Sequence, residues 1–333
     1  MIWHLPHLRA LAHHVGGRVT LVARPRSLAN QLVGPADGIE GVFWIERDQW
    51  ITAGRHQGLG GLRRLIADLR AQRFDAAILL TRSRTLAVVA AAAGIPRRHG
   101  YGIGPQRPFL NRPPFLPAAA YRLHPYDQAG AWLQAASIPL PDPEPRLIVD
   151  PAARQAVWER LSRVEAPLVV LGIGASDAWK RWGPDPFAAL ATRLLAQGWP
   201  ALVLLGGDAE RADAEAVLAL LTPADAARIS TALDWGLRDV AALLQQAAFY
   251  VGNDTAGLNI AAAVGTRAYG LFGATQVLRH SRQIVPIVPP GGPDEDTGMA
   301  RIAVGAVLDA IAADRQRPDT ASAPLQMRAS HTD

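Results

Sequence analysis

The chain has 333 residues, and apolar residues make up 49% of them, a globular composition with enough length to bury a core. It contains no cysteine, which excludes a disulfide framework, a thiolate zinc site and a cysteine nucleophile, and fits a reducing compartment such as the cytoplasm. No apolar run is long enough to span a membrane, and no basic region followed by an apolar core opens the sequence, so we expect neither a transmembrane helix nor a signal peptide.

The formal net charge is +5, but the basic residues are concentrated in the first half. Residues 1–150 carry 18 arginines against 10 acids, whereas the rest of the chain carries 16 basic and 19 acidic residues. This imbalance predicts an anionic partner, either phosphate, nucleic acid or an anionic lipid surface, and a solvated face explains it equally well. Of the 34 basic residues only Lys180 is a lysine. Because ammonium and guanidinium differ in shape and hydration, this lone lysine is a functional candidate.

Short apolar runs alternate with helical patterns in the first half of the chain. The patterns predict strands at 18–23, 41–46 and 75–80, and helices at 60–72 and 84–94. This alternation is typical of βαβ units built around a parallel sheet.

A proline-rich stretch from 104 to 145 interrupts the alternation, and we interpret it as leading to a domain boundary. The alternation then returns, with a helix predicted at 184–198. The strands predicted in this second half are 167–174, 201–207, 249–254 and 267–273. We therefore expect an N-terminal domain of residues 1–145, a C-terminal domain of residues 146–313 and a disordered polar tail of residues 314–333.

Polar residues follow three of the strands predicted in the second half. In parallel sheets, ligands bind beyond the carboxyl ends of the strands. The candidate site therefore comprises GASD (174–177), GGD (206–208) and GNDT (252–255).

The segment GIGASDAWKRW (172–182) combines glycines, a hydroxyl group and positive charge. Gly174 allows a close backbone approach, Ser176 offers its hydroxyl, and Lys180 adds charge, a combination that suits a diphosphate. A dinucleotide fingerprint fits poorly because Asp177 stands where its third glycine belongs, and the spacing of a Walker A loop is absent. An ordinary turn between a strand and a helix is the alternative.

The segment VGNDTAGLNIAAAVG (251–265) places polar residues where a buried strand meets a small apolar helix. Asp254 or Thr255 is in position to cap that helix. The N–H groups at a helix start also bind anions, and Gly257 lets a ligand come near. A leaving diphosphate would be stabilised there as its bond breaks, while Asp254 accepts hydrogen bonds from sugar hydroxyls.

Other polar features give weaker signals. His280 is a candidate site residue, but a lone loop histidine is more often solvated, and we favour the solvated interpretation. The acidic stretch 293–298 contains a D-x-D pattern within a Pro/Gly loop, and His4 and His7 lack a third ligand, so no metal site is expected. The latter two histidines are expected on a helix surface or in a cleft.

In their order and spacing, these motifs resemble glycosyltransferase family nine, the ADP-heptose:lipopolysaccharide heptosyltransferases. The resemblance rests on WKRWGPDPFAALATRLLAQG, GGDAER, VGNDTAGLNIAAAVGT and LFGATQ, and RTLAVVAAAAGIPRRHGYG (84–102) is similar to the family's first domain. It covers nearly the whole chain as far as residue 313. It implies an α/β GT-B fold, in which two Rossmann-like domains face each other across a cleft, the first binding the acceptor and the second the nucleotide-sugar.

The resemblance also implies a reaction: inverting transfer of heptose from ADP-heptose to a hydroxyl of the lipopolysaccharide core, without a metal or other cofactor. Lys180 and Ser176 would contact the diphosphate, and Asp254 the heptose. The other residues implied to bind the donor are Gly174, Asp208, Glu210, Asn253, Thr255, Ala256 and Gly257. The anionic, lipid-linked glycan acceptor fits the basic first half. We expect no nucleic-acid partner, and a cytoplasmic protein with at most peripheral contact with the inner membrane.

The sequence departs from the family pattern at two places. Many members have a histidine where Asn259 stands. Members also begin with a strand and a loop ending in Gly-Asp, whose aspartate is the expected general base, whereas this sequence starts at MIWHLPHLRAL, within the following helix. Without that central strand, RVTLVA is expected to be unpaired on one side. We therefore expect the natural reading frame to extend upstream by a strand and a loop.

Two other functions remain open on the sequence alone. One is transfer of a different nucleotide-sugar to an O-antigen or another glycan. The second is a non-catalytic GT-B module that binds a sugar or a nucleotide, which the missing aspartate favours. Retained ADP binding without transfer would distinguish the module from both enzymes.

Overall fold

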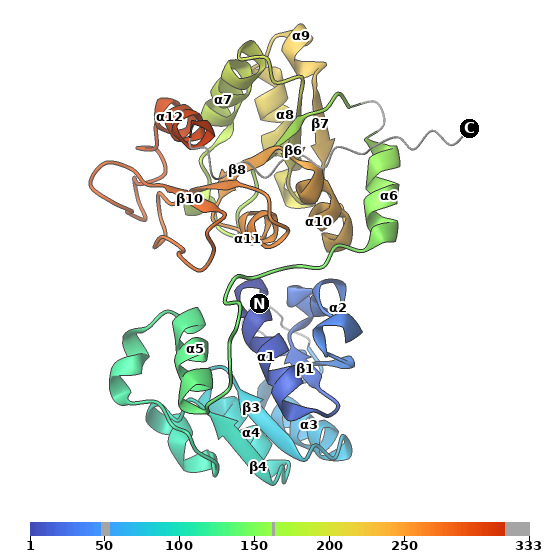
Figure 1. Ribbon diagram of the computed structural model, residues 1–333, viewed down its shortest axis with the longest axis vertical. Coiled ribbons are helices and arrows are strands. Elements are labelled where there is room, and N and C mark those ends of the chain that lie inside the picture. Colours follow the sequence, from blue (N-terminus) through green and yellow to red (C-terminus); the bar gives the residue numbers. More distant parts are fainter. Residues whose placement is uncertain (48–53, 162–163, 317–333) are drawn as a thin grey trace. The chain divides into compact units, whose positions relative to one another are not determined.

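The computed structural model describes residues 1–47, 54–161 and 164–316 (Figure 1). The chain divides into two compact units between Pro145 and Arg146. Each unit packs around apolar clusters of its own.

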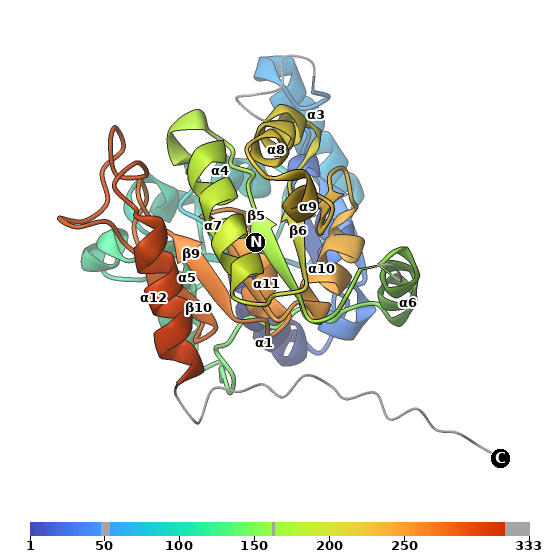
Figure 2. The same ribbon diagram turned by 90° about the horizontal axis from the view of Figure 1, so that it is seen from above.

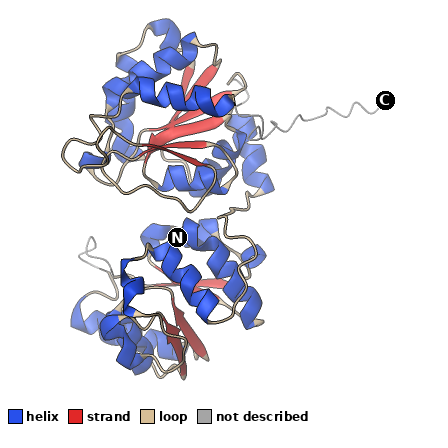
Figure 3. Ribbon diagram, turned by 60° about the vertical axis from the view of Figure 1, so that its left-hand side comes forward, coloured by secondary structure: helices blue, strands red, loops and turns tan. Residues whose placement is uncertain are grey.

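The described part of the first unit combines short strands with helices (Figure 3). Its strands are β1 (Thr20–Ala23), β2 (Gly41–Trp44), β3 (Ala76–Leu79) and β4 (Arg97–Gly100). Its α-helices are α1 (Leu5–Val15), α2 (Ala29–Leu32), α3 (Gly58–Ala71), α4 (Arg84–Ala92) and α5 (Pro125–Ala135). Its 3₁₀ turns are Ile2–His4, Pro25–Ser27, Pro35–Asp37, Gly104–Phe109 and Ala118–Arg122.

The strands of the first unit form two separate parallel pairs, β1 with β2 and β3 with β4. Within the described ranges β1 therefore pairs along one edge only, which confirms the expectation for RVTLVA. Its Val22 side chain is 42% exposed. Helices supply the burial that these short pairs cannot provide alone, with Leu65 of α3 and Val89 of α4 fully buried in one cluster.

The strands and helices predicted for this unit are confirmed to within a few residues, but the prediction misses α2, β4 and α5. Helix α5 begins at Pro125, a residue well suited to the first helical position. His124 caps it, because its Nδ1 accepts the Tyr126 N–H at 3.2 Å. Trp132 then anchors the helix in the core at 2% exposure. The proline-rich stretch thus contains a packed helix and belongs to the first unit.

The second unit contains the larger sheet. Its strands are β5 (Leu168–Gly172), β6 (Ala201–Leu205), β7 (Ile229–Ala232), β8 (Phe249–Asn253), β9 (Ala268–Leu271) and β10 (Ile284–Ile287). Its α-helices are α6 (Pro151–Arg160), α7 (Pro184–Ala196), α8 (Arg211–Ala219), α9 (Pro223–Ala226), α10 (Leu237–Gln246), α11 (Ala256–Ala263) and α12 (Val304–Arg315). Two 3₁₀ turns, Ala178–Lys180 and Asp208–Glu210, follow β5 and β6.

The six strands are all parallel and lie in the order β10-β9-β8-β5-β6-β7. Helices α7, α8 and α12 cover one face of the sheet, and α10 and α11 cover the other (Figures 1 and 2). Because both faces are covered, β5, β6 and β8 are buried along their whole length, which explains their continuous apolar sequences.

Strand β5 lies between β6 and β8, so the chain leaves it toward one side of the sheet and later returns on the other. Such a reversal of strand order is the switch point at which open α/β sheets bind ligands, beyond the carboxyl ends of the strands. In this unit the switch point lies between the ends of β5 and β8.

The C-terminal helix extends further than the sequence suggests, since the predicted tail starts at residue 314 and α12 continues to Arg315. Asp314 is buried, and its carboxylate is compensated by two hydrogen bonds from Arg267, at 2.5 and 2.6 Å, and one from the Tyr269 hydroxyl at 3.1 Å. The rest of the predicted tail, residues 317–333, lies outside the described residues.

Candidate functional site

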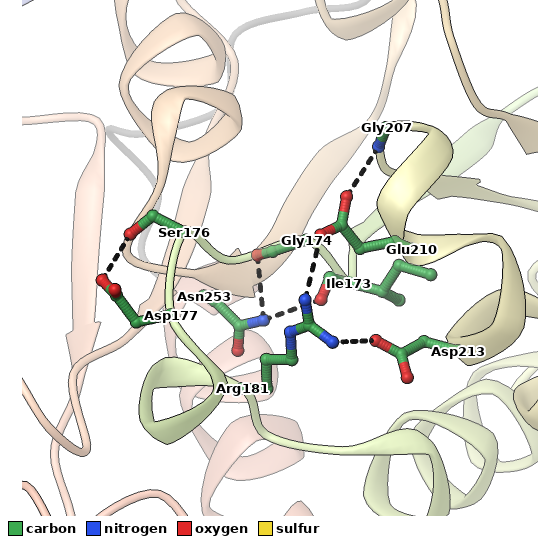
Figure 4. A network of polar contacts seen from close by, with 9 residues as sticks. All are labelled: Ile173, Gly174, Ser176, Asp177, Arg181, Gly207, Glu210, Asp213 and Asn253. Carbon is green, nitrogen blue, oxygen red and sulfur yellow. Dashed lines mark hydrogen bonds and ion pairs between the residues drawn. The ribbon is translucent and has the colours of Figure 1, made fainter. Parts of the chain in front are cut away.

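Asn253, at the end of β8, holds the loop that follows β5 (Figure 4). Its side chain is fully buried. Its Nδ2 donates to the carbonyl oxygens of Ile173 and Gly174 at 3.0 and 3.1 Å, and its Oδ1 accepts the Trp182 N–H at 3.2 Å. The amide is therefore saturated within the protein. Asn253 positions the loop at the switch point, whereas the sequence suggested that it contacts the donor.

Lys180 lies in this loop, and its ammonium is held by neighbours. Its Nζ is 2.9 Å from Asp177 Oδ2 and 3.4 Å from Ser176 Oγ, and it lies 4.6 Å from the ring centroid of Trp179. Hydrogen bonds from Lys180 and then Ser176 lower the pKa of Asp177. The structure thus brings Lys180 and Ser176 together as expected, and it adds a carboxylate partner that the sequence analysis did not assign.

The two acids after β6 have different environments. Glu210 is only 10% exposed: its Oε2 accepts the Gly207 N–H at 2.9 Å, and its Oε1 lies 3.4 Å from Arg181, which also pairs with Asp213 (Figure 4). Asp208, in contrast, is 77% exposed and pairs with Arg211 at the surface. Glu210 thus closes a turn within the unit, whereas the carboxylate of Asp208 faces solvent.

The N-terminus of α11 starts at the switch point. Thr255 occupies the N-cap position, but its side chain makes no capping hydrogen bond, so of the two predicted caps the one by Thr255 is wrong. The adjacent Ala256 is exposed. The first N–H groups of any α-helix lack intrahelical acceptors and carry partial positive charge. Asp254, half-buried beside this turn, accepts a hydrogen bond from Thr275 Oγ1 at 2.8 Å.

Three glycines near this helix end make room for Tyr250. A Cβ built on Gly172, Gly252 or Gly257 would lie 1.9, 2.3 or 3.0 Å from the Tyr250 hydroxyl oxygen. Burial raises the pKa of this phenol, which faces Thr255. Packing against this buried ring is therefore one reason for glycine at position 257, and the approach of a ligand there stays a prediction.

Two other predictions about histidines are wrong. His280 is 9% exposed, not solvated, and its Nε2 lies 3.1 Å from Asn259 Oδ1. His7 is fully buried and lies on neither a surface nor a cleft. Both of its ring nitrogens lack a hydrogen-bond partner, and burial lowers its pKa to about 4. The burial of neither histidine could be predicted from the sequence. The histidines of α1 do not share one face of the helix, and the loop around His280 has no periodic pattern.

The first unit contains a polar cluster of its own, formed by Glu46, Arg55, His56 and Asp68. His56 Nδ1 accepts the Glu46 N–H at 3.0 Å, so its Nε2 donates to Asp68 Oδ2 at 3.1 Å. Hydrogen bonds from Arg55 and His56 lower the pKa of Asp68 to about 2. This cluster links Glu46, which follows β2, to Asp68 of α3.

The acidic stretch 293–298 folds as a turn. Asp294 Oδ1 accepts the N–H groups of Asp296 and Thr297 at 3.1 and 2.8 Å and the Thr297 hydroxyl at 3.0 Å. These bonds lower its pKa. Across the described ranges, no group of three or more His, Cys, Asp or Glu side chains is arranged to hold a metal ion.

The fold is GT-B, as in solved heptosyltransferase structures, and the family model places the chain among the glycosyltransferases. The chain belongs to glycosyltransferase family 9 (heptosyltransferase), whose model matches residues 62–286. It is 27% identical over 244 residues to lipopolysaccharide heptosyltransferase 2 of Escherichia coli (strain K12), covering 69% of this chain and 70% of that protein. These results confirm the fold class, the family and the enzyme class that the sequence motifs indicate.

Solved structures share the fold. The E. coli ADP-heptose lps heptosyltransferase II superposes with a TM-score of 0.73 at 22% identity, over 94% of each chain. The E. coli heptosyltransferase WaaC with ADP-2-deoxy-2-fluoro heptose gives a TM-score of 0.69 at 18% identity, over 94% of this chain and 95% of that one. At these identities the superpositions show a common fold.

Proposed function

We propose that this chain transfers heptose from ADP-heptose to a hydroxyl group of the lipopolysaccharide core, with inversion at the anomeric carbon. Membership of the heptosyltransferase family and similarity to lipopolysaccharide heptosyltransferase 2 support this reaction. The observation that carries the site assignment is the position of Lys180 and of the start of α11, in the segments that follow the two strands flanking the switch point.

The donor's diphosphate fits this pair of features. Lys180 supplies a full positive charge, and the amides of Thr255 and Ala256 supply the partial charge of a helix start. Ser176, whose Oγ now donates to Asp177 at 2.7 Å, can redirect its hydroxyl to a phosphate oxygen. Gly174 brings its backbone to the same edge, and we assign Asp208 to the ribose.

Catalysis follows from where charge develops. As the glycosidic bond to ADP breaks, negative charge grows on the leaving diphosphate, and groups fixed in advance around it lower the barrier. We assign this role to Lys180 and the α11 amides, with no metal or other cofactor. Asp254, held in place by Thr275, is assigned to the heptose hydroxyls.

We assign the acceptor to the first unit, whose excess of arginine suits an anionic, lipid-linked glycan. In the part of the chain that the structure describes, no helix has the length and apolar character of a membrane span. Contact with the inner membrane would accordingly be peripheral and electrostatic.

A transfer assay tests the proposal. Wild-type protein is incubated with ADP-heptose and a lipid-linked core acceptor, and mass spectrometry detects the addition of one heptose. Lys180→Ala should reduce the rate roughly ten- to a hundredfold, the cost of losing hydrogen bonds to a charged group. Arg193→Ala, an exposed charge on α7, is the matched control. Transfer from another nucleotide-sugar instead, or ADP binding without any transfer, would refute the proposal in favour of the corresponding alternative.

A further inference from the structure

We propose that His280 is a positioning residue that acts through Asn259 on the first turn of α11, an inference that rests on the proposed diphosphate site. His280 lies in the loop after β9, and Asn259 lies one turn into α11. Their side chains meet at 3.1 Å, between His280 Nε2 and Asn259 Oδ1, and His280 is 9% exposed.

The hydrogen bonds of Asn259 fix the direction of this contact. Its Nδ2 donates to the Thr255 carbonyl oxygen at 2.9 Å, so its Oδ1 is the atom that faces His280. A carbonyl oxygen only accepts, and the proton therefore resides on His280 Nε2. Two successive hydrogen bonds thus run from His280 to Asn259 and from Asn259 to the carbonyl oxygen of Thr255.

The side chain of Asn259 restrains Thr255 more closely than the helix backbone does. The Asn259 backbone N–H reaches the same carbonyl at 3.4 Å, a long hydrogen bond, whereas the side-chain amide reaches it at 2.9 Å. Thr255 is the N-cap residue, and its side chain provides no cap. The orientation of the first α11 amides therefore depends on Asn259, and the rotamer of Asn259 depends on His280.

A second contact ties the same loop to the other side of this turn. Thr275 Oγ1 donates to Asp254 Oδ2 at 2.8 Å. The loop of residues 272–281 thus holds both Asp254, assigned to the sugar, and the turn assigned to the diphosphate. Loss of the His280 contact should loosen the diphosphate site while Asp254 stays anchored, so donor affinity should change more than the rate of the bound complex.

The experiment compares four single variants of the full chain, three of them in the loop that carries His280. His280→Phe keeps a planar ring and removes the donor, His280→Gln restores an amide donor, and Arg279→Gln changes the exposed neighbouring residue. Calorimetry measures ADP affinity, the transfer assay separates KM for the donor from kcat, and hydrogen exchange reports the amides of residues 255–258 without ligand. Melting temperatures identify any general loss of stability.

We expect His280→Phe to weaken ADP binding and raise the donor KM roughly five- to tenfold, with faster exchange at 255–258 and kcat within about twofold. His280→Gln and Arg279→Gln should resemble the wild type. Asn259→Leu removes the side chain that links His280 to the Thr255 carbonyl oxygen, so it should reproduce the effect. It replaces His280→Phe as the test if that variant does not fold.

Wild-type affinity and exchange in both His280→Phe and Asn259→Leu would overturn the inference. Equal losses in His280→Phe and Arg279→Gln would also overturn it, because the effect would then belong to the loop as a whole. A wild-type protein that binds no ADP would instead refute the proposed function, and the exchange measurement would still decide whether His280 orders the turn.

Discussion

The stability of the first unit should depend on the charge state of His7. This residue is fully buried with both ring nitrogens unpartnered, and its ring packs against His4 and Tyr126 at centroid distances of 5.5 and 4.8 Å. No carboxylate is among these neighbours to compensate an imidazolium. Burial accordingly lowers the pKa of His7 from 6.5 to about 4.

The sign of the pH dependence follows from this direction. The unfolded chain binds a proton near pH 6.5 and the folded chain only near pH 4, so folding is opposed increasingly as the pH falls between these values. The full difference corresponds to roughly 3 kcal/mol, and about 2 kcal/mol of it is already lost at pH 5. Above pH 7 the penalty is absent.

Urea unfolding at pH 7.5 and pH 5 tests this reasoning in the wild type and in His7→Leu. The substitution removes the titrating group and the two unpartnered nitrogens, so His7→Leu should lose roughly 2 kcal/mol less than the wild type between the two pH values. His13→Leu, at an exposed position on the same helix, is the control and should behave like the wild type. An equal acid loss in wild type and His7→Leu would refute the burial argument.

Two further predictions concern the switch point. Asp177→Asn removes the carboxylate that competes for Lys180 and should increase ADP affinity roughly two- to fivefold by calorimetry; unchanged or weaker binding would mean that this carboxylate does not compete. Gly172→Ala places a Cβ 1.9 Å from the Tyr250 hydroxyl oxygen and should destabilise the second unit by roughly 1–3 kcal/mol in urea unfolding. An unchanged unfolding midpoint would show that Tyr250 can move aside.

The sequence predicts the inner strands of the second unit better than its edges. Strands β5, β6 and β8 are covered on both faces, and this burial leaves a continuous apolar signature. The missed strands β7 and β10 are the two edges of the sheet. Strand β10 even contains Pro286, which an edge strand tolerates and a central strand does not.

The sequence predicts that polar loops gather at one edge of the second unit's sheet, because polar residues after parallel strands must meet there. It does not predict the contacts of the individual residues in these loops. Asn253 and Glu210 are engaged by partners distant in sequence, as their contacts with Ile173 and Arg181 show. Such tertiary contacts have no local pattern, and the same holds for the burial of His280.

A crystal structure of the complex with ADP tests the central claim most directly. The account predicts the diphosphate at the ends of β5 and β8, with Lys180 Nζ moved from Asp177 to a phosphate oxygen and the amides of Thr255 and Ala256 within hydrogen-bonding distance, roughly 2.7–3.2 Å. A diphosphate bound away from α11, with Lys180 still paired to Asp177, would contradict it.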